Sequence, residues 1–167
     1  MQLVFSSYIL WAQRALCLLM LLVMLGVDLL PFWPTLSIFP AVPLIGIFYL
    51  FIFRPDVMTL EILVLLGIIQ DGIYGYPLGL SILSNLLLYG LLFTQRRFID
   101  KQSFLFLWGA FAGFALIAYA LHWGLVSFAR GEVLSYTSRL TGLALTITLF
   151  PPMSVVLSYF VKKRGGK

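Results

Sequence analysis

The chain has 167 residues, of which 62% are hydrophobic and only 10% are charged, and its formal charge is +5. A soluble domain is nearer half apolar and a quarter charged, and it needs a polar surface to meet water. This composition excludes an ordinary soluble domain and predicts a chain whose main solvent is lipid. The apolar runs are unbroken rather than alternating, which favours membrane-spanning helices over the strands of a barrel.

A bilayer core of ~30 Å requires about 20 apolar residues in each spanning helix. The apolar runs predict six transmembrane helices, at about residues 9–30, 35–53, 57–74, 80–94, 104–125 and 140–161. Pro40 and Pro43 predict a kink or a broken first turn in the second helix, and a re-entrant second segment would leave five spans. Pro151 and Pro152 predict a kink in the sixth helix. No loop is long enough for a second domain, so residues 1–167 are expected to form a single polytopic membrane domain.

The basic residues give these helices an orientation. With six spans, nine of the eleven basic residues lie on the side of the two termini, and only Arg130 and Arg139 lie on the other side. Cytoplasmic loops carry the excess of Lys and Arg, so both termini are expected to be cytoplasmic. The positive charge is then explained by topology and by anionic lipid headgroups, and nucleic acid is not expected as a partner.

Asp71 is the most informative polar residue at membrane depth, because an ionisable group there is costly and is a functional candidate. Gly67, Asp71 and Gly75 recur four residues apart on the third helix, and Ser81 and Asn85 recur in the same way on the fourth. Small residues at this spacing let two helices approach closely. We therefore expect a seam between these helices, in which Ser81 or Asn85 hydrogen-bonds Asp71. The alternative is a carboxylate that reaches the outer membrane interface.

The remaining polar side chains are expected at the membrane interfaces. Glu61 is predicted to form an ion pair with Arg54 near the cytoplasmic end of the third helix. His122 and Asp28 are placed at the outer ends of their helices. A single histidine is a poor metal site, and Cys17 is the only cysteine and lies within an apolar run. No metal or cofactor is expected.

The segment Gly109-Ala-Phe-Ala-Gly113 matches the GxxxG pattern, which indicates close helix packing within the protein or against a partner. The sequence carries no nucleotide-binding loop, no HExxH and no GxSxG. Glu61 and Asp71 are ten residues apart on one helix, about 15 Å along its axis, so they cannot act as a catalytic pair. The chain is therefore not expected to be an enzyme.

Residues 54–79 carry a more specific pattern. Arg54-Pro55 is followed by an apolar helix and then by the run Gly67-Ile-Ile-Gln-Asp71-Gly-Ile-Tyr-Gly75-Tyr-Pro77-Leu-Gly79. This order resembles the rod shape-determining protein MreD family, and the proline of the last helix and the basic tail agree with it. Gln70 beside the aspartate and the doubled proline at 151–152 depart from the family pattern.

The resemblance implies a non-catalytic subunit of the bacterial cell-wall elongation (rod) complex, in the cytoplasmic (inner) membrane. Its implied partners are MreC, which has a single span and a large extracytoplasmic domain, the actin-like MreB, a RodA-type glycosyltransferase and a penicillin-binding transpeptidase. Helix faces with small residues would hold partner helices, and the outer turn from Gly75 to Gly79 would dock an extracytoplasmic domain.

The MreD family is also similar in fold to the six-helix, substrate-binding S components of vitamin transporters. This similarity supplies the alternative function, a transporter S component. Such proteins usually carry an Ala-x-x-x-Ala pattern on the first helix, which residues 15–30 lack.

Overall fold

The computed structural model describes residues 2–28, 41–99, 103–131 and 137–162 of the chain. Within these ranges the fold is all-α, which confirms the expected six helices for the described part of the chain. They are α1 (Gln2–Asp28), α3 (Val42–Phe53), α4 (Leu60–Tyr74), α5 (Leu80–Ile99), α6 (Phe104–Arg130) and α7 (Thr137–Lys162). Residues 29–30 and 35–40, which were expected to belong to the first two helices, lie outside the described residues.

Four helices run further than the apolar pattern predicts, and one of them is α7, which begins at Thr137 instead of near residue 140. α1 begins at Gln2 instead of near residue 9, α5 continues to Ile99 instead of 94, and α6 continues to Arg130 instead of 125. Hydropathy locates the bilayer core, whereas the hydrogen bonds of a helix are internal and continue into the headgroups and water. The helix ends therefore lie beyond the ends of the apolar runs.

Pro43 begins a helix instead of kinking one. It stands in the first turn of α3, where no hydrogen bond within the helix requires its missing N–H. Of the two expectations for this helix, a kink or a broken first turn, Pro43 makes no kink within α3 and instead stands at its start. Pro40 lies outside the described residues.

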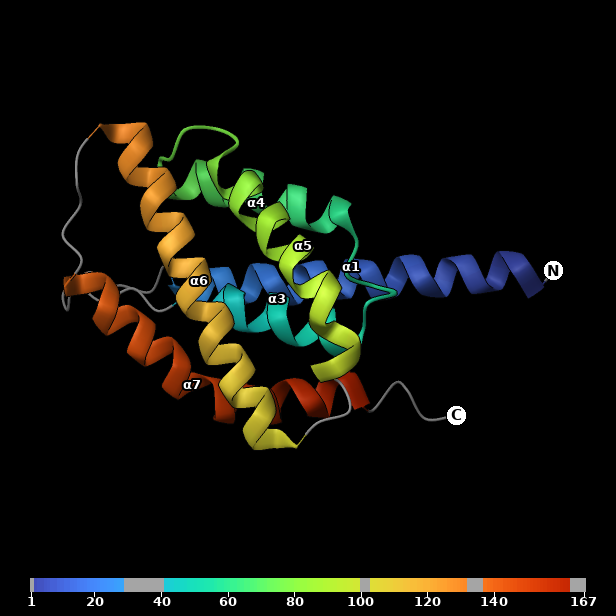
Figure 1. Ribbon diagram of the computed structural model, residues 1–167. Helices are drawn as coiled ribbons and strands as arrows, with labels where there is room; N and C mark the ends of the chain where they lie inside the picture. The colour runs from blue at the N-terminus through green and yellow to red at the C-terminus, as the bar shows by residue number, and fades with distance from the viewer. Residues whose placement is uncertain (1, 29–40, 100–102, 132–136, 163–167) are drawn as a thin grey trace.

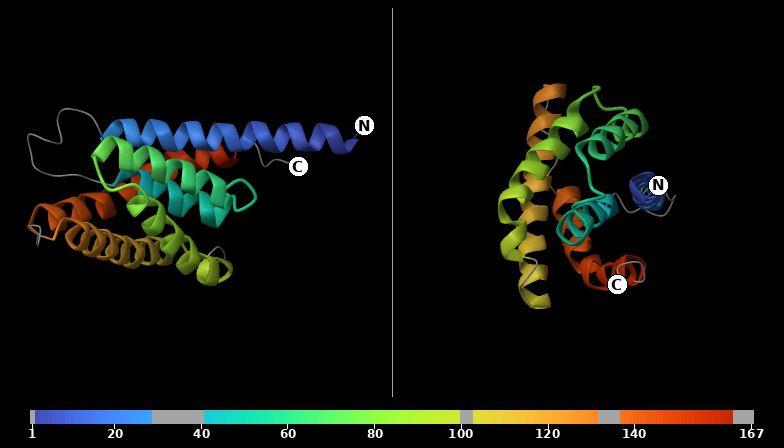
Figure 2. Two further views of the ribbon diagram at one scale, coloured as in Figure 1. Left: turned by 90° about the horizontal axis from the view of Figure 1, so that it is seen from above. Right: turned by 90° about the vertical axis from the view of Figure 1, so that its right-hand side faces the viewer.

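The short helix α3 occupies the centre of the bundle. It contacts α1, α5, α6 and α7, and the right-hand view of Figure 2 shows it enclosed by the other helices. Eleven of its twelve residues are buried, which explains why its sequence is apolar on every face. Twelve residues rise about 18 Å, so the described part of α3 is shorter than the ~30 Å bilayer core.

By length and composition, three helices can cross a membrane. The candidate spans are Trp11–Asp28, Phe104–Ala129 and Leu140–Tyr159, and Val42–Phe53 and Leu80–Thr94 are shorter apolar helices. This set of apolar helices makes the chain a multi-pass membrane protein.

An aromatic cluster joins α3 to α6 and α7. The ring of Phe48 lies 5.2 Å from the rings of Phe111 and Phe114 and 5.8 Å from that of Phe150. Phe111 and Phe150 stack with their centroids 4.2 Å apart. These four side chains are almost fully buried, and edge-to-face and stacked pairs of this kind add to the stability that burial gives.

Helix α7 contains the two prolines within its length, and it changes direction along its course (Figure 1). The change agrees with the expected kink. Pro151 has no N–H to donate to the carbonyl of Ile147, four residues earlier. The indole N–H of Trp108 on α6 donates to that carbonyl instead, at 3.1 Å. A donor from the neighbouring helix thus satisfies the group that the proline leaves free, as a helix in lipid requires.

The connections alternate between the two ends of the bundle. The left-hand view of Figure 2 shows the α4–α5 turn at one end, and the α3–α4 connection, the start of α1 and the end of α7 at the other. We call the first the turn end and the second the terminal end. The two ends carry different polar groups.

Candidate functional site

The turn between α4 and α5 is built around the carboxylate of Asp71. The side chain is 1% exposed. Its Oδ2 accepts a hydrogen bond from the backbone N–H of Gly79 at 2.7 Å, and its Oδ1 accepts one from the N–H of Ser81 at 2.9 Å. The first N–H groups of a helix have no partner within the helix and carry partial positive charge. Asp71 therefore caps the start of α5 from the preceding helix.

Three glycines around Asp71 have separate roles. A Cβ on Gly67 would lie 2.8 Å from backbone and side-chain atoms of Ile82, so only glycine lets α4 approach α5 this closely. Gly75 ends α4 with φ of 63° and Gly79 has φ of 102°, both in the left-handed region that glycine adopts without strain. Of the expected stripe, Gly67 and Asp71 lie in the seam, whereas Gly75 forms the helix end.

The expected hydrogen bond between Ser81 and Asp71 is present, and its donor is the backbone N–H of Ser81. Ser81 is buried and donates to the carboxylate through its main chain. Asn85 is also buried, but its Nδ2 donates to Oε1 of Gln70 at 3.1 Å. Backbone N–H groups bind the carboxylate because Asp71 lies level with the first turn of α5, where these donors have no partner within the helix. Gln70 and Asn85 make a second polar contact across the same pair of helices.

The tip of this turn is exposed and partly apolar. Pro77 is exposed and Leu78 is 82% exposed. Tyr76 is half-buried, and its ring packs edge-on against the ring of His122 on α6, with the centroids 5.1 Å apart. His122 is thus a packing partner of the turn. Asp71 and Tyr76 hold the backbone while Leu78 projects from it.

A second buried aspartate lies at the turn end. Asp28 is the last residue of α1 and is 5% exposed, so it is buried against other parts of the protein. Its expected position at the outer membrane interface stays a prediction. Its Oδ1 accepts from the N–H of Val42 at 3.3 Å, and its Oδ2 accepts from the hydroxyl of Tyr74 at 3.5 Å. Like Asp71, Asp28 accepts a hydrogen bond from a backbone N–H group at the start of another helix, here α3. The sequence gives no signal for this contact, because Asp28 and its donors come from three separate elements.

The residue before α3 is held in a similar way. The N–H of Ala41 donates to the hydroxyl of Tyr119 on α6 at 3.1 Å and to that of Thr146 on α7 at 3.0 Å. These hydroxyls are 2.9 Å apart. The start of the central helix is therefore fixed by side chains of α1, α6 and α7, which makes the turn end the polar centre of the fold.

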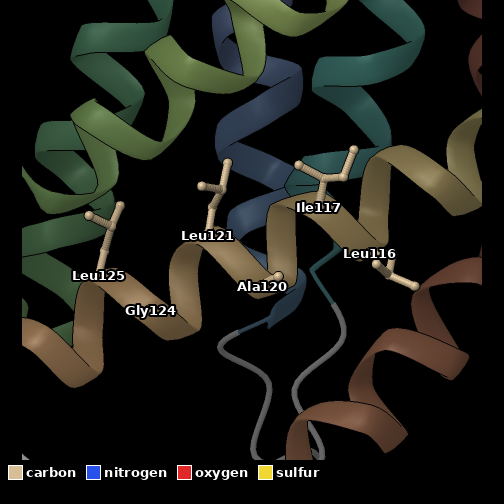
Figure 3. A pocket seen from close by; sticks show the side chains of 6 residues that line it. All are labelled: Leu116, Ile117, Ala120, Leu121, Gly124 and Leu125. Carbon is tan, nitrogen blue, oxygen red and sulfur yellow. The ribbon is translucent and has the colours of Figure 1, made fainter.

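The GxxxG pattern of α6 faces outward. An added Cβ on Gly109 or Gly113 would meet no atom of the described residues within 4 Å. Further along the same helix lies a shallow apolar hollow of 460 Å³, lined by Leu116, Ile117, Ala120, Leu121, Gly124 and Leu125. Figure 3 shows Leu116 on one side of the hollow, Leu121 and Leu125 on the other, and Ala120 and Gly124 between them. Ala120 and Gly124 therefore give the floor of the hollow little side-chain bulk, and larger side chains border it.

The terminal end of the described structure carries the exposed carboxylate Glu61 and two half-buried guanidinium groups, those of Arg14 and Arg54. The ion pair expected between Arg54 and Glu61 is not present among the described residues. The Nη2 of Arg54 donates to Oε1 of Gln13 on α1 at 3.0 Å, and Glu61 lies in the first turn of α4, where the helix dipole favours a negative charge. Arg14 lies 5.7 Å from the ring of Trp11, and its Nε is buried without a hydrogen-bond partner among the described residues.

Chemically, this arrangement can support binding. Within the residues that the structure describes, no three His, Cys, Asp or Glu side chains gather in a way that could hold a metal ion. Asp28 and Asp71 accept hydrogen bonds from backbone donors, which orders helix ends. Two of the exposed features are the apolar tip of the 75–79 turn and the open face of α6.

Comparisons with protein-family models, with curated proteins and with solved structures return no match for this chain.

Proposed function

We propose that the protein is a non-catalytic scaffold subunit of the bacterial rod complex, of the MreD type, with six membrane crossings and both termini in the cytoplasm. Its partner would be a single-span protein like MreC, and RodA-type glycosyltransferase, penicillin-binding transpeptidase and MreB would belong to the same assembly. In this orientation the turn end faces outward, because nine of the eleven basic residues lie on the opposite side.

The observation that carries the proposal is the Asp71 turn. The residues on which the resemblance rests form one structural unit: Gly67 lets two helices meet, Asp71 caps the next helix, and Gly75 and Gly79 supply the left-handed backbone. This unit holds the tip with Leu78 in a fixed position. An apolar anchor that is ordered before binding loses little entropy when a partner docks on it.

The open face of α6 supports a second contact with the same partner. Helices associate in lipid by close packing, and glycines without neighbours allow another backbone to approach. Gly109 and Gly113 have that open space. The transmembrane helix of a single-span partner would pack there, while its extracytoplasmic domain would dock on the outer turn.

Co-purification from native membranes, followed by identification of the bound proteins, tests this function. The expected partner is a single-span protein with a coiled coil and a large extracytoplasmic domain. The double substitution Gly109→Leu and Gly113→Leu is expected to reduce its recovery at least fivefold. Gly90→Leu is the matched control, because Gly90 lies on α5 and an added Cβ there would also meet no described atom within 4 Å, and it should leave recovery unchanged.

The same experiment separates the alternative function. Recovery of an ATPase module or of a bound vitamin would favour the transporter S component and would contradict the scaffold. Recovery of the single-span partner with equal yield from both glycine variants would keep the scaffold function and reject α6 as the contact.

A further inference from the structure

The exposed side of α4 is apolar in the middle and polar at both ends. Glu61 is exposed in the first turn of the helix, and Gly75 ends the helix in the turn that Asp71 holds. Between these ends the exposed residues carry no polar side chain, and they are Leu65, Ile68, Gly72 and Ile73. Fourteen residues separate Glu61 from Gly75, which gives this apolar surface a length of about 21 Å along the helix.

This length is an upper limit on the height of α4 across a membrane, because any tilt of the helix reduces it. A hydrocarbon core is ~30 Å thick, so the apolar surface of α4 is too short by about 9 Å. The short side chain of Glu61 can make up only part of this difference, and Asp56 is a second exposed carboxylate at the same end. Carboxylates and turn backbone are costly inside hydrocarbon, because no water is there to hydrogen-bond them.

The neighbouring helix α5 has the same limit. Its apolar part, Leu80–Thr94, has 15 residues and rises about 22 Å before the polar run that begins at Gln95. α4 and α5 pack against each other, and α4 lies on the opposite side of the bundle from α7 (Figures 1 and 2). The candidate spans of α6 and α7, Phe104–Ala129 and Leu140–Tyr159, have 26 and 20 residues and reach about 39 Å and 30 Å. The short apolar surface is therefore confined to the α4–α5 hairpin.

We propose that the bilayer is thinned where it meets the α4–α5 hairpin, and that this surface binds lipids with short acyl chains in preference to long ones. A membrane can adjust to a short hydrophobic surface by thinning, at a cost that increases with each Å of mismatch. Lipids with shorter chains lower this cost and accumulate at the surface. The inference rests on the six crossings of the proposed function and is independent of its partner.

Fluorescence quenching by brominated lipids tests this preference on the purified full-length protein. A bimane label is attached to Ile68→Cys on α4 or to Leu116→Cys on α6, each combined with Cys17→Ala, which removes the only native cysteine. Both labelled positions lie near the middle of their apolar runs, and their native side chains are 46% and 58% exposed. The vesicles contain equal amounts of phosphatidylcholine with 14-carbon and 18-carbon chains, and bromine is placed on one lipid or the other. The 14-carbon lipid is expected to be enriched about twofold at position 68 and to be at its bulk ratio at position 116.

Substitution of Glu61 tests whether the acidic end of α4 sets the length of the surface. Glu61→Leu adds about one helical turn, ~5 Å, to the apolar side of α4 and should return the lipids at position 68 to nearly their bulk ratio. Glu61→Gln is the matched control, because it removes the charge and keeps a polar side chain. This variant should retain the twofold enrichment.

The outcomes separate the thinning from the six crossings. Equal quenching by the two lipids at position 68, or the same enrichment at positions 68 and 116, would overturn the thinning and leave the six crossings in place. Enrichment that persists in Glu61→Leu would also overturn it. If neither brominated lipid quenches the label at position 68, α4 does not lie in the bilayer, and both the thinning and the six crossings are rejected.

Discussion

Replacing Asp71 with alanine removes the acceptor of two backbone N–H groups at the start of α5. Both bonds are short, at 2.7 Å to Gly79 and 2.9 Å to Ser81, and the carboxylate is 1% exposed. A hydrogen bond to a charged group contributes about 1.5–3 kcal/mol, so losing two lowers the free energy of unfolding by about 3–6 kcal/mol. Asp71→Asn keeps one acceptor oxygen and should lose about half of that, roughly 1.5–3 kcal/mol.

The free energy of unfolding can be measured in mixed micelles by titration with sodium dodecyl sulfate, followed by circular dichroism. Glu61→Gln is the matched control, because Glu61 is an exposed carboxylate on the same helix, and it should change stability by less than about 0.5 kcal/mol. An Asp71→Ala protein within 0.5 kcal/mol of the wild type would refute the assignment of Asp71 as the cap of α5.

Two further substitutions test the helix contacts in the same assay. Gly67→Ala places a Cβ 2.8 Å from the backbone of α5 and should destabilise the protein by about 1–3 kcal/mol. Gly72→Ala is the control, because its Cβ would meet no atom within 4 Å, and it should be neutral or slightly stabilising. Equal effects of the two substitutions would contradict the close approach of α4 to α5. Trp108→Phe removes the donor to the carbonyl of Ile147, which Pro151 leaves free on α7. This substitution should lower the free energy of unfolding by about 1 kcal/mol. Trp11→Phe is the control and should not lower it. A neutral Trp108→Phe would show that this carbonyl finds another donor.

The sequence alone could predict the helices, because the signals for them are local. Unbroken apolar runs mark the spans, and proline, glycine and charged residues separate them. The seam at Asp71 was also accessible, since Gly67 and Asp71 lie on one face of a helix that must turn back at Gly75. The two prolines of α7 indicated the change in direction that this helix shows.

The contacts that the sequence could not supply depend on three or more elements. The hydrogen bonds of Asp28 to Val42 and Tyr74 could not be predicted, because the three residues lie on separate helices. The ion pair expected between Arg54 and Glu61 was wrong because α1 brings Gln13 to the arginine. Local spacing predicts neighbours along one helix, and these pairs arise from the packing of separate helices around α3.

The resemblance and the structure contribute different parts of the functional proposal. The resemblance supplies the rod complex and its partners, which geometry alone does not identify. The structure supplies a physical role for the residues that carry the resemblance, namely a turn whose backbone is fixed by Asp71 and whose tip exposes Leu78. The proposed function therefore predicts that the partner binds the turn end of the molecule.

Site-specific photo-crosslinking in living cells tests that claim most directly. A benzoylphenylalanine in place of Leu78, which is 82% exposed at the turn end, is compared with one in place of Asp56, which is exposed in the α3–α4 connection at the opposite end. The account predicts a crosslink from position 78 to the extracytoplasmic domain of a single-span protein, and none to that domain from position 56. Absence of that crosslink at position 78, together with capture of an ATPase from position 56, would contradict it.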